Sequence, residues 1–266
     1  MNRLSTEHRA LILVCLVEGM SMNSAARAVQ VKPDTVARLV VRLGKACQKY
    51  QNQTLQKLSC TELQCDEIWS FVGAKQKNVT GKQRKSGWGD VWTWVAIDPK
   101  TKLVPCWHVG GREDEDATCF MRLLSEKVRG YVEITTDGLL AYSGAIASVF
   151  GDKVKHRVLM KTPAPAGSLI KSHVSGMDPE DEAEIDHAST SMIERQNLTI
   201  RMQMRRFTRK TNGHSKKLAN HKHALALFFM YYNFGRVHMT LKTTPAMKAG
   251  IADHVWTLKE IVGLMD

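Results

Sequence analysis

Apolar side chains recur at helical spacing in three short groups within the first fifty residues. The first group can be capped by Ser5 or Thr6 and ends at Gly19, and the third begins at Pro33, a residue typical of a first helical turn. The apolar positions are Ala10, Leu13, Val14 and Val17, then Ala25, Ala26, Ala28 and Val29, then Val36, Leu39, Val40 and Leu43. The pattern predicts an all-α helix-turn-helix domain over residues 1–47.

The third helix of such a domain would place its first turns in the major groove of DNA. The polar positions expected to face DNA are Lys32, Asp34, Thr35, Arg38 and Arg42, with Arg38 best placed to read bases. A plain helical bundle that mediates dimerisation is the alternative interpretation. The polar run 48–57 predicts a linker, which we place at residues 48–62.

From residue 63 the pattern changes to short runs of β-branched and aromatic residues separated by turn residues. We expect three successive antiparallel strands, then a helix, a strand, a helix and a strand, over 63–73, 90–98, 102–111, 115–129, 131–138, 139–150 and 154–161. This order indicates an α/β domain over residues 63–250, followed by a C-terminal tail over 251–266. Prolines, glycines and an acidic cluster predict a loop or insertion over 162–187.

The balance of charge favours a polyanionic partner. Lysine and arginine number 38 against 26 aspartates and glutamates, which gives a formal net charge of +12, and nucleic acid is the simplest partner for such a chain. The connection 74–89 is particularly basic, with Lys75, Lys77, Lys82, Arg84 and Lys85. It predicts an exposed hairpin that contacts the DNA backbone, with a merely solvated loop as the alternative.

Other classes of protein are disfavoured by what the chain lacks. No apolar run approaches the roughly eighteen residues of a membrane span, and the N-terminus has no apolar segment of the signal-peptide type. We therefore expect a soluble, cytoplasmic protein with no membrane partner. The six cysteines include no C-x-x-C pair and no Cys/His finger, so reduced and mostly buried thiols are expected.

The stretch 187–217 places one carboxylate within a strongly basic helix. At about 100° per residue, one face carries Glu194, Leu198, Arg201 and Arg205, and the apolar stripe beside it carries Ile193, Ile200, Met204 and Phe207. The basic residues are Arg195, Arg201, Arg205, Arg206, Arg209 and Lys210. A carboxylate that holds a divalent cation beside arginines that hold phosphates would account for this pattern. A solvated helix with local ion pairs is the alternative.

Two further carboxylates lie where a metal site could use them. Asp66 is in the middle of a strand, where burial is costly unless the carboxylate is paired or bound to metal. Asp137 lies where a strand meets Gly138, the kind of strand end at which active-site groups gather in α/β folds. Capping of the next helix is the alternative role for Asp137. The combination of an acid within a strand, an acid at a strand end and Glu194 on a helix is a more specific sign of a metal site than any one of the three alone.

These segments resemble the DDE transposases of bacterial insertion sequences, within the insertion sequence 1 family. The motifs are DEIWSFVG at 66–73, TTDG at 135–138, STSMIERQNLTIRMQMRRFTRKTN at 189–212 and YNFGRVHMTLKTTPAMKAG at 232–250. The resemblance implies a ribonuclease-H-like catalytic domain with a catalytic triad of Asp66, Asp137 and Glu194. It also matches Arg201 to a basic residue two helical turns beyond the glutamate. Many members carry a zinc finger before the helix-turn-helix, and this chain lacks its cysteines.

The activity implied by the resemblance is DNA transposition. The triad would share two Mg²⁺ ions about 3.5 to 4 Å apart, with Mn²⁺ as a substitute, for strand cleavage and for joining of 3′ ends to target DNA. The implied partners are double-stranded DNA, as element ends and as target, and further copies of the chain in a dimer or higher oligomer on DNA. The implied location is the cytoplasm, in association with the nucleoid.

Three other functions are alternatives to transposition. A metal-dependent nuclease of the same fold and a helix-turn-helix regulator remain alternatives, because sequence alone does not separate hydrolysis from strand transfer. A tyrosine recombinase would need Tyr231 or Tyr232 as its nucleophile, beside Arg236 and His238. These tyrosines are better explained as part of the apolar face of the last long helix, with Leu225, Leu227, Phe228 and Phe229.

Two histidines of that helix, His221 and His223, could suggest a metal site. We expect them instead at the surface, since two histidines in a polar helical segment are more often solvated than ligating.

Overall fold

The computed structural model describes residues 4–163, 169–175, 189–208 and 212–266. By its internal contacts the chain divides into two compact units. The helical unit comprises Met1–Leu55, Trp69–Val91 and Leu198–Asp266, and the sheet unit comprises Gln56–Ile68 and Trp92–Asn197. No helix among the described residues is both long enough and apolar enough to cross a membrane.

The central sheet has six strands in the order β3-β2-β1-β4-β5-β6. Their bounds are β1 (Glu62–Val72), β2 (Gly89–Ile97), β3 (Trp107–Gly110), β4 (Val132–Thr136), β5 (Val154–Pro163) and β6 (Leu169–Ser175). β1, β4 and β5 run parallel to one another, whereas β2 pairs with β3 and β5 pairs with β6 in antiparallel fashion. The first five strands thus have the ribonuclease-H-like order that the family resemblance implied, and β6 extends the sheet at one edge.

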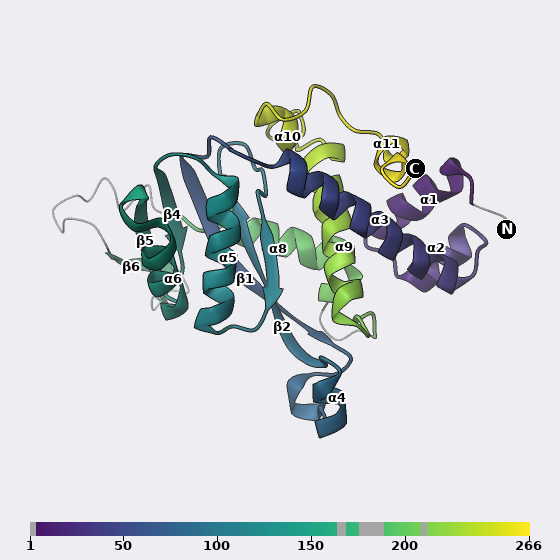
Figure 1. Ribbon diagram of the computed structural model, residues 1–266, viewed down its shortest axis with the longest axis horizontal. Helices are drawn as coiled ribbons and strands as arrows, with labels where there is room; N and C mark the ends of the chain where they lie inside the picture. The colour runs from purple at the N-terminus through teal and green to yellow at the C-terminus, as the bar shows by residue number, and fades with distance from the viewer. Residues whose placement is uncertain (1–3, 164–168, 176–188, 209–211) are drawn as a thin grey trace. The chain divides into compact units, whose positions relative to one another are not determined.

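Two helices of the sheet unit, α5 (Asp114–Lys127) and α6 (Leu140–Phe150), pack against each other in Figure 1. α6 belongs to the connection between the parallel strands β4 and β5, which needs a crossover rather than a tight turn. The fully buried ring of Trp94 on β2 meets Phe120 of α5 at 6.1 Å and Tyr142 of α6 at 5.2 Å between ring centroids. These rings form much of the core that supports the strands.

The helical unit contains the three expected N-terminal helices, α1 (Thr6–Val17), α2 (Met22–Ala28) and α3 (Pro33–Thr54). Ser5 caps α1 by accepting the backbone N–H of His8, as its position in the sequence indicated. The same unit includes α9 (Leu218–Met230), which packs along α3, a π-helical turn at Tyr231–Gly235, α10 (Pro245–Lys248) and α11 (Leu258–Gly263), which packs on α1. Figure 1 shows α3 and α9 crossing in contact.

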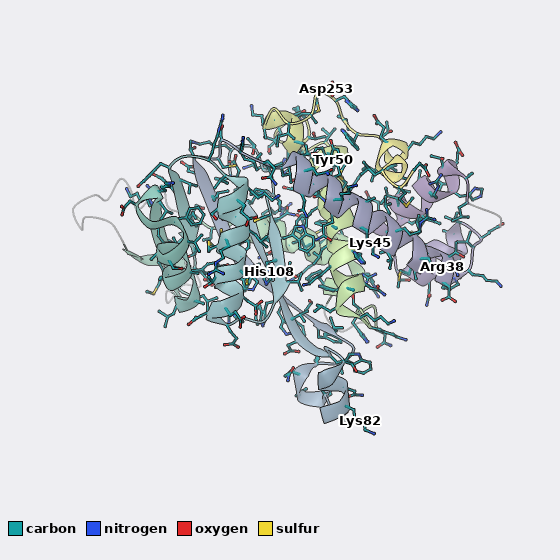
Figure 2. The ribbon with its side chains drawn as sticks, in the orientation of Figure 1. Arg38, Lys45, Tyr50, Lys82, His108 and Asp253 are labelled. Atoms are coloured by element: carbon teal, nitrogen blue, oxygen red, sulfur yellow. The ribbon has the colours of Figure 1, made fainter. Side chains whose placement is uncertain are left out.

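The linker prediction is wrong over residues 48–54, because α3 continues to Thr54. The polar composition of this run hides one buried face. Gln51 is buried, and its Nε2 donates hydrogen bonds to the carbonyl oxygens of Cys47 at 3.1 Å and Ala226 on α9 at 2.9 Å. Tyr50, labelled in Figure 2, packs against Trp256, with 4.8 Å between the two ring centroids.

Three other boundaries differ from the sequence predictions. Residues 169–175, expected in a loop or insertion, form β6, while 164–168 and 176–188 lie outside the described residues. The expected C-terminal tail over 251–266 contains α11, whose Ile261 and Val262 are fully buried. A strand was expected over 102–111, but β3 covers only its last part, Trp107–Gly110.

The basic connection between β1 and β2 is helical rather than a hairpin. It contains a 3-10 turn at Gln76–Asn78 and the short helix α4 (Gly81–Lys85). The ring of Trp88 occupies the space where a side chain at residue 73 would lie, and Gly73 has a φ of +72°, so only glycine fits this turn well. The connection is therefore built of short helical turns, of which α4 is labelled in Figure 1.

Candidate metal and active site

Asp66 lies within β1 and is half-buried. Its Oδ1 accepts the backbone N–H of Glu67 at 2.8 Å, and its Oδ2 accepts the side-chain amide of Asn197 at 2.8 Å. Burial raises the pKa of Asp66 to about 6, and the negative charges of Asp137 and Glu194 act in the same direction. A carboxylate destabilised in this way is one that a cation would stabilise.

Asp137 follows directly after β4, which runs parallel to β1. The register pairs Gln64 with Thr135, and continuing it by two residues brings Asp137 level with Asp66. Its Oδ1 accepts the backbone N–H of Leu139 at 3.0 Å, so the carboxylate also shapes the turn into α6. Leu139 rather than Asp137 is the N-cap residue of α6, which distinguishes this contact from the capping role considered as the alternative.

A third carboxylate of this cluster is Glu67, which was not among the site residues expected from the sequence. Asp66, Glu67 and Asp137 each offer a carboxylate oxygen, and these atoms all lie within 4.8 Å of one another. The side chain of Glu67 is 1% exposed. Burial raises the pKa of Glu67 to about 7, aided by Asp137 and Asp66 and opposed by Arg112. The available signal was a second consecutive acid in an otherwise apolar strand, within the motif DEIWSFVG.

The oxygens of Glu67 are already occupied by protein donors. Oε1 accepts Nη2 of Arg112 at 2.6 Å and Nε of the same side chain at 2.8 Å, and Oε2 accepts the hydroxyl of Tyr142 at 3.2 Å. Glu67 is thus paired with a cationic side chain, whereas the donors to Asp66 and Asp137 are neutral N–H groups.

Glu194 lies in the first turn of α8 (Ser191–Gln203) and is exposed. It is not part of the tight three-residue cluster, but its charge contributes to the raised pKa of Asp66. Its Oε1 accepts the hydroxyl of Thr190 at 2.7 Å. The start of α8 is tied to β1, because Oε1 of Gln64 accepts the backbone N–H groups of Met192 at 2.9 Å and Ile193 at 3.1 Å.

The donor set of this cluster fits a hard divalent cation. Carboxylate oxygens are the ligands that Mg²⁺ and Mn²⁺ favour. The carboxylates repel one another in a partly buried position, and a bound cation would offset this repulsion. Glu194 lies one helical turn before Asn197, the residue that donates to Asp66.

The other basic residues of 187–217 are distributed differently from the expected single face. α8 ends at Gln203, so Arg205 is not in the same helix as Glu194 but in a 3-10 turn, Arg205–Phe207, where it is exposed. Arg201 is half-buried in the last turn of α8. The apolar stripe is confirmed, since its four members, Ile193, Ile200, Met204 and Phe207, are all buried.

Arg206 was expected to contact DNA, and its position argues against that role. Its Nη1 donates to Oγ of Ser215 at 2.5 Å, and its Nη2 lies 3.7 Å from Sδ of Met22. Burial lowers the pKa of Arg206 to about 10. The guanidinium therefore serves the packing of the helical unit.

The remaining expected DNA contacts are spread over α3 and α4. Lys32, Asp34, Arg38, Arg42 and Lys82 are exposed, and Thr35 is half-buried. Figure 2 labels Arg38 and Lys45 on α3 and Lys82 on α4. Arg84 and Lys85 belong to α4, although their side chains are not described, and Arg209 and Lys210 lie outside the described residues.

The expectation of a surface position for His221 is wrong. The residue is fully buried, with Nδ1 3.1 Å from Oγ of Ser215 and Nε2 3.4 Å from Oγ of Ser70. Burial lowers the pKa of His221 to about 3, so the ring is neutral near pH 7. Tyr232 is buried within the apolar helical segment, as expected from its pattern.

Comparison with known proteins supports the motif-based resemblance. The chain is similar to an insertion-element protein. Over 169 residues it is 25% identical to the insertion element iso-IS1n protein InsB of Shigella dysenteriae, in a match that covers 64% of this chain and 94% of that protein. The resemblance to the insertion sequence 1 family is thereby confirmed. No protein-family model matches the chain.

Solved structures give weaker likenesses. The piggyBac transposase synaptic complex with hairpin DNA aligns with 100% of this chain and 71% of its own, at 11% identity and a TM-score of 0.49. A pre-cleavage Mos1 transpososome aligns with 85% of this chain and 78% of its own, at 11% identity and a TM-score of 0.24. Because both scores are below 0.5, the fold assignment rests on the strand order of this chain's own sheet.

Proposed function

We propose that this protein is a transposase that binds the ends of an insertion sequence, cleaves DNA strands there and joins the 3′ ends to target DNA. The observation that carries the proposal is the position of Asp66 level with Asp137 on parallel strands, with the start of α8 and its Glu194 tied to the same strand. The similarity to an insertion-element protein supports it.

In this proposal Asp66, Asp137 and Glu194 hold divalent cations, with Mg²⁺ as the first candidate and Mn²⁺ as a substitute. When bound, two such ions supply Lewis-acid activation of the attacking oxygen and stabilisation of the leaving oxygen in a displacement at phosphorus. The carboxylates act as ionised ligands rather than as general acids. Asn197 and the backbone N–H of Glu67 orient Asp66, because each donates to one of its two oxygens.

The basic residues of the chain supply the contacts to DNA. The first half of α3 would read the element ends through Arg38, and Arg42 and Lys82 would contact the backbone. Arg201, seven residues after Glu194 on α8, lies about 10.5 Å further along the helix axis at about 1.5 Å per residue. It would position a phosphate near the scissile bond rather than contact the cations. Since two ends must be joined in one event, we expect a dimer or higher oligomer on DNA.

One assay tests the activity. The protein is incubated with labelled duplexes that carry the DNA bordering its reading frame, with Mg²⁺ and with a supercoiled target plasmid. We expect joined products. Nicked or cut duplexes alone would instead indicate a nuclease, and binding alone would indicate a regulator.

The metal ligands are tested by Asp66→Asn, Asp137→Asn and Glu194→Gln, each expected to reduce cleavage by at least about 10³-fold while DNA affinity is retained, because residues that act as one unit fail together. Asp152→Asn is the matched control, since Asp152 is exposed beyond the far end of α6. Normal cleavage by a folded variant would remove that residue from the ligand set.

A further inference from the structure

Arg112 is held at the edge of the acidic cluster by a fixed loop. The loop follows β3, and its Gly111 donates its backbone N–H to Oδ2 of Asp116 at 2.7 Å and accepts Nε1 of the buried Trp94 at 3.0 Å. Oδ1 of Asp116 also pairs with Nε2 of His108, labelled in Figure 2, at 2.8 Å. These contacts fix the backbone on both sides of Arg112 before any ligand arrives.

Within the described part of the chain, only some of the donors of the Arg112 guanidinium have a partner. Two of its donors, Nε and Nη2, meet the same oxygen of Glu67, and its plane lies over Trp92 with the central carbon 4.6 Å from the ring centroid. An arginine has five N–H donors. The side chain is 42% exposed, whereas that of Glu67 is 1% exposed. One edge of the fork is thus anchored in the protein, while the side chain as a whole keeps substantial solvent exposure.

A buried carboxylate is a costly way to fix a loop. Glu67 lies among Asp66 and Asp137, where its charge repels theirs, and an apolar residue on the same strand face would avoid this cost. The carboxylate of Glu67 does, however, hold the positive, bidentate guanidinium of Arg112 in a fixed position. That position is next to Asp66 and Asp137, whose oxygens would hold cations. A phosphodiester brought to this acidic cluster needs such a donor to offset the repulsion between anions.

We propose that Arg112 binds a DNA phosphate beside the scissile bond and that Glu67 is the positioning residue that holds its guanidinium there. The inference rests on the proposed function, since it assumes DNA at the acidic cluster. It gives Glu67 a role distinct from that of a metal ligand. A purely structural ion pair between β1 and the loop after β3 is the competing account.

The test begins with DNA affinity measured in EDTA, which does not depend on metal-loaded activity. Wild type, Arg112→Gln and Arg112→Lys are compared on a labelled duplex between about 50 and 200 mM salt. Arg112→Gln should reduce the slope of log affinity against log salt by about 1, the value for one phosphate contact. Arg112→Lys should keep the slope but raise KM for cleavage more than it lowers kcat, because the charge stays and the fork is lost. Arg122→Gln, which removes an exposed arginine of α5, should change neither quantity.

Arg112→Gln leaves the carboxylate of Glu67 buried without its partner, so the double variant Glu67→Gln/Arg112→Met is measured alongside it. Because this variant removes both charges, its folding does not depend on the ion pair, and it should show the same loss of slope. A folded double variant with the wild-type slope would overturn the proposal.

The phosphate itself is identified with a methylphosphonate at the cleavage position mapped for wild type. This neutral linkage should lower the affinity of wild type for the duplex. It should not lower the affinity of Arg112→Gln further, because that variant has already lost the contact. If the substitution and the methylphosphonate lower the affinity additively, the assignment of Arg112 to that phosphate is overturned. If wild type cleaves nothing, the proposed function fails, whereas the salt slopes still decide whether Arg112 binds DNA.

Discussion

The side-chain amide of Asn197 donates a hydrogen bond of 2.8 Å to Oδ2 of Asp66 and so joins α8 to β1 at the acidic cluster. Asn197 is buried and lies three residues after Glu194, a spacing that puts both side chains on one side of the helix. The bond therefore fixes the orientation of Asp66 and, through the helix, the position of Glu194 relative to it.

Replacement of Asn197 by alanine should weaken cation binding while the protein stays folded. Loss of a donor that orients a carboxylate ligand typically costs about 10- to 100-fold in metal affinity. We expect a comparable rise in the Mg²⁺ concentration for half-maximal cleavage, measured by titration. Asn78→Ala, at an exposed position, is the control. An unchanged Mg²⁺ requirement in Asn197→Ala would show that the bond to Asp66 has no part in the site.

Cation stabilisation of the protein should increase with pH. Burial raises the pKa of Asp66 from 3.8 to about 6 and that of Glu67 from 4.5 to about 7. Since both folded-state values lie above the unfolded ones, the stability associated with the protonated forms is complete below about pH 4 and is lost as the pH rises through about 6 and 7. A cation that binds ionised Asp66 together with Asp137 offsets this loss of stability, by about 2.7 kcal/mol at one hundred times its Kd.

The measurement is the difference in Tm between Mg²⁺ and EDTA at pH values from 5 to 8. It should be small at pH 5 and large at pH 8 in wild type, and small throughout in Asp137→Asn. A Mg²⁺ effect that is equal at both ends of the range would contradict this account of the cluster.

The sequence predicted the order of strands and helices well because that order follows from local patterns. Pro33 begins α3, Asp66 lies within β1 and Asp137 follows β4, as their sequence contexts indicated. The pair Glu67–Arg112 could not be found in this way, because the two residues are 45 positions apart and meet only when the sheet forms.

Buried polar residues account for the other differences. Gln51 and His221 belong to polar runs that suggested a linker and a surface, yet both are buried because their side chains find hydrogen-bond partners in the helical unit. A pattern of apolar and polar residues shows whether a side chain is polar. It does not show whether the folded protein offers that side chain a hydrogen-bond partner, which is what allows it to be buried.

Gly44→Ala should destabilise the protein, whereas Gly144→Ala should stabilise it. A Cβ at Gly44 on α3 would overlap the carbonyl oxygen of His223 and lie 2.6 Å from its Cβ, but one at Gly144 on α6 would meet nothing within 4 Å. Overpacking lowers the free energy of unfolding by about 1–3 kcal/mol. Replacing a glycine inside a helix by alanine raises it by about 0.5–1 kcal/mol. Thermal melting of both variants checks the signs. A rise in Tm for Gly44→Ala would mean that α3 and α9 can move apart at little cost.

Recognition of element ends by α3 must be tested with single substitutions rather than by deletion of residues 1–50. Such a deletion would remove most of α3, the helix that packs along α9, including Gly44, which lies directly against His223, so loss of DNA binding would follow from unfolding alone. Arg38→Gln and Arg42→Gln change exposed side chains and should leave Tm unaltered.

The two substitutions should have different effects on DNA. If Arg38 reads bases, Arg38→Gln loses about 1–3 kcal/mol of discrimination between element ends and random duplex. If Arg42 contacts phosphate, Arg42→Gln weakens both duplexes equally and lowers the salt slope by about 1. Gel-shift competition measures both quantities, with Lys248→Gln on α10 as the control for loss of one exposed charge. Retained discrimination in Arg38→Gln would place sequence reading elsewhere, and α4 is the next element to vary, because its sequence is basic and its Lys82 is exposed.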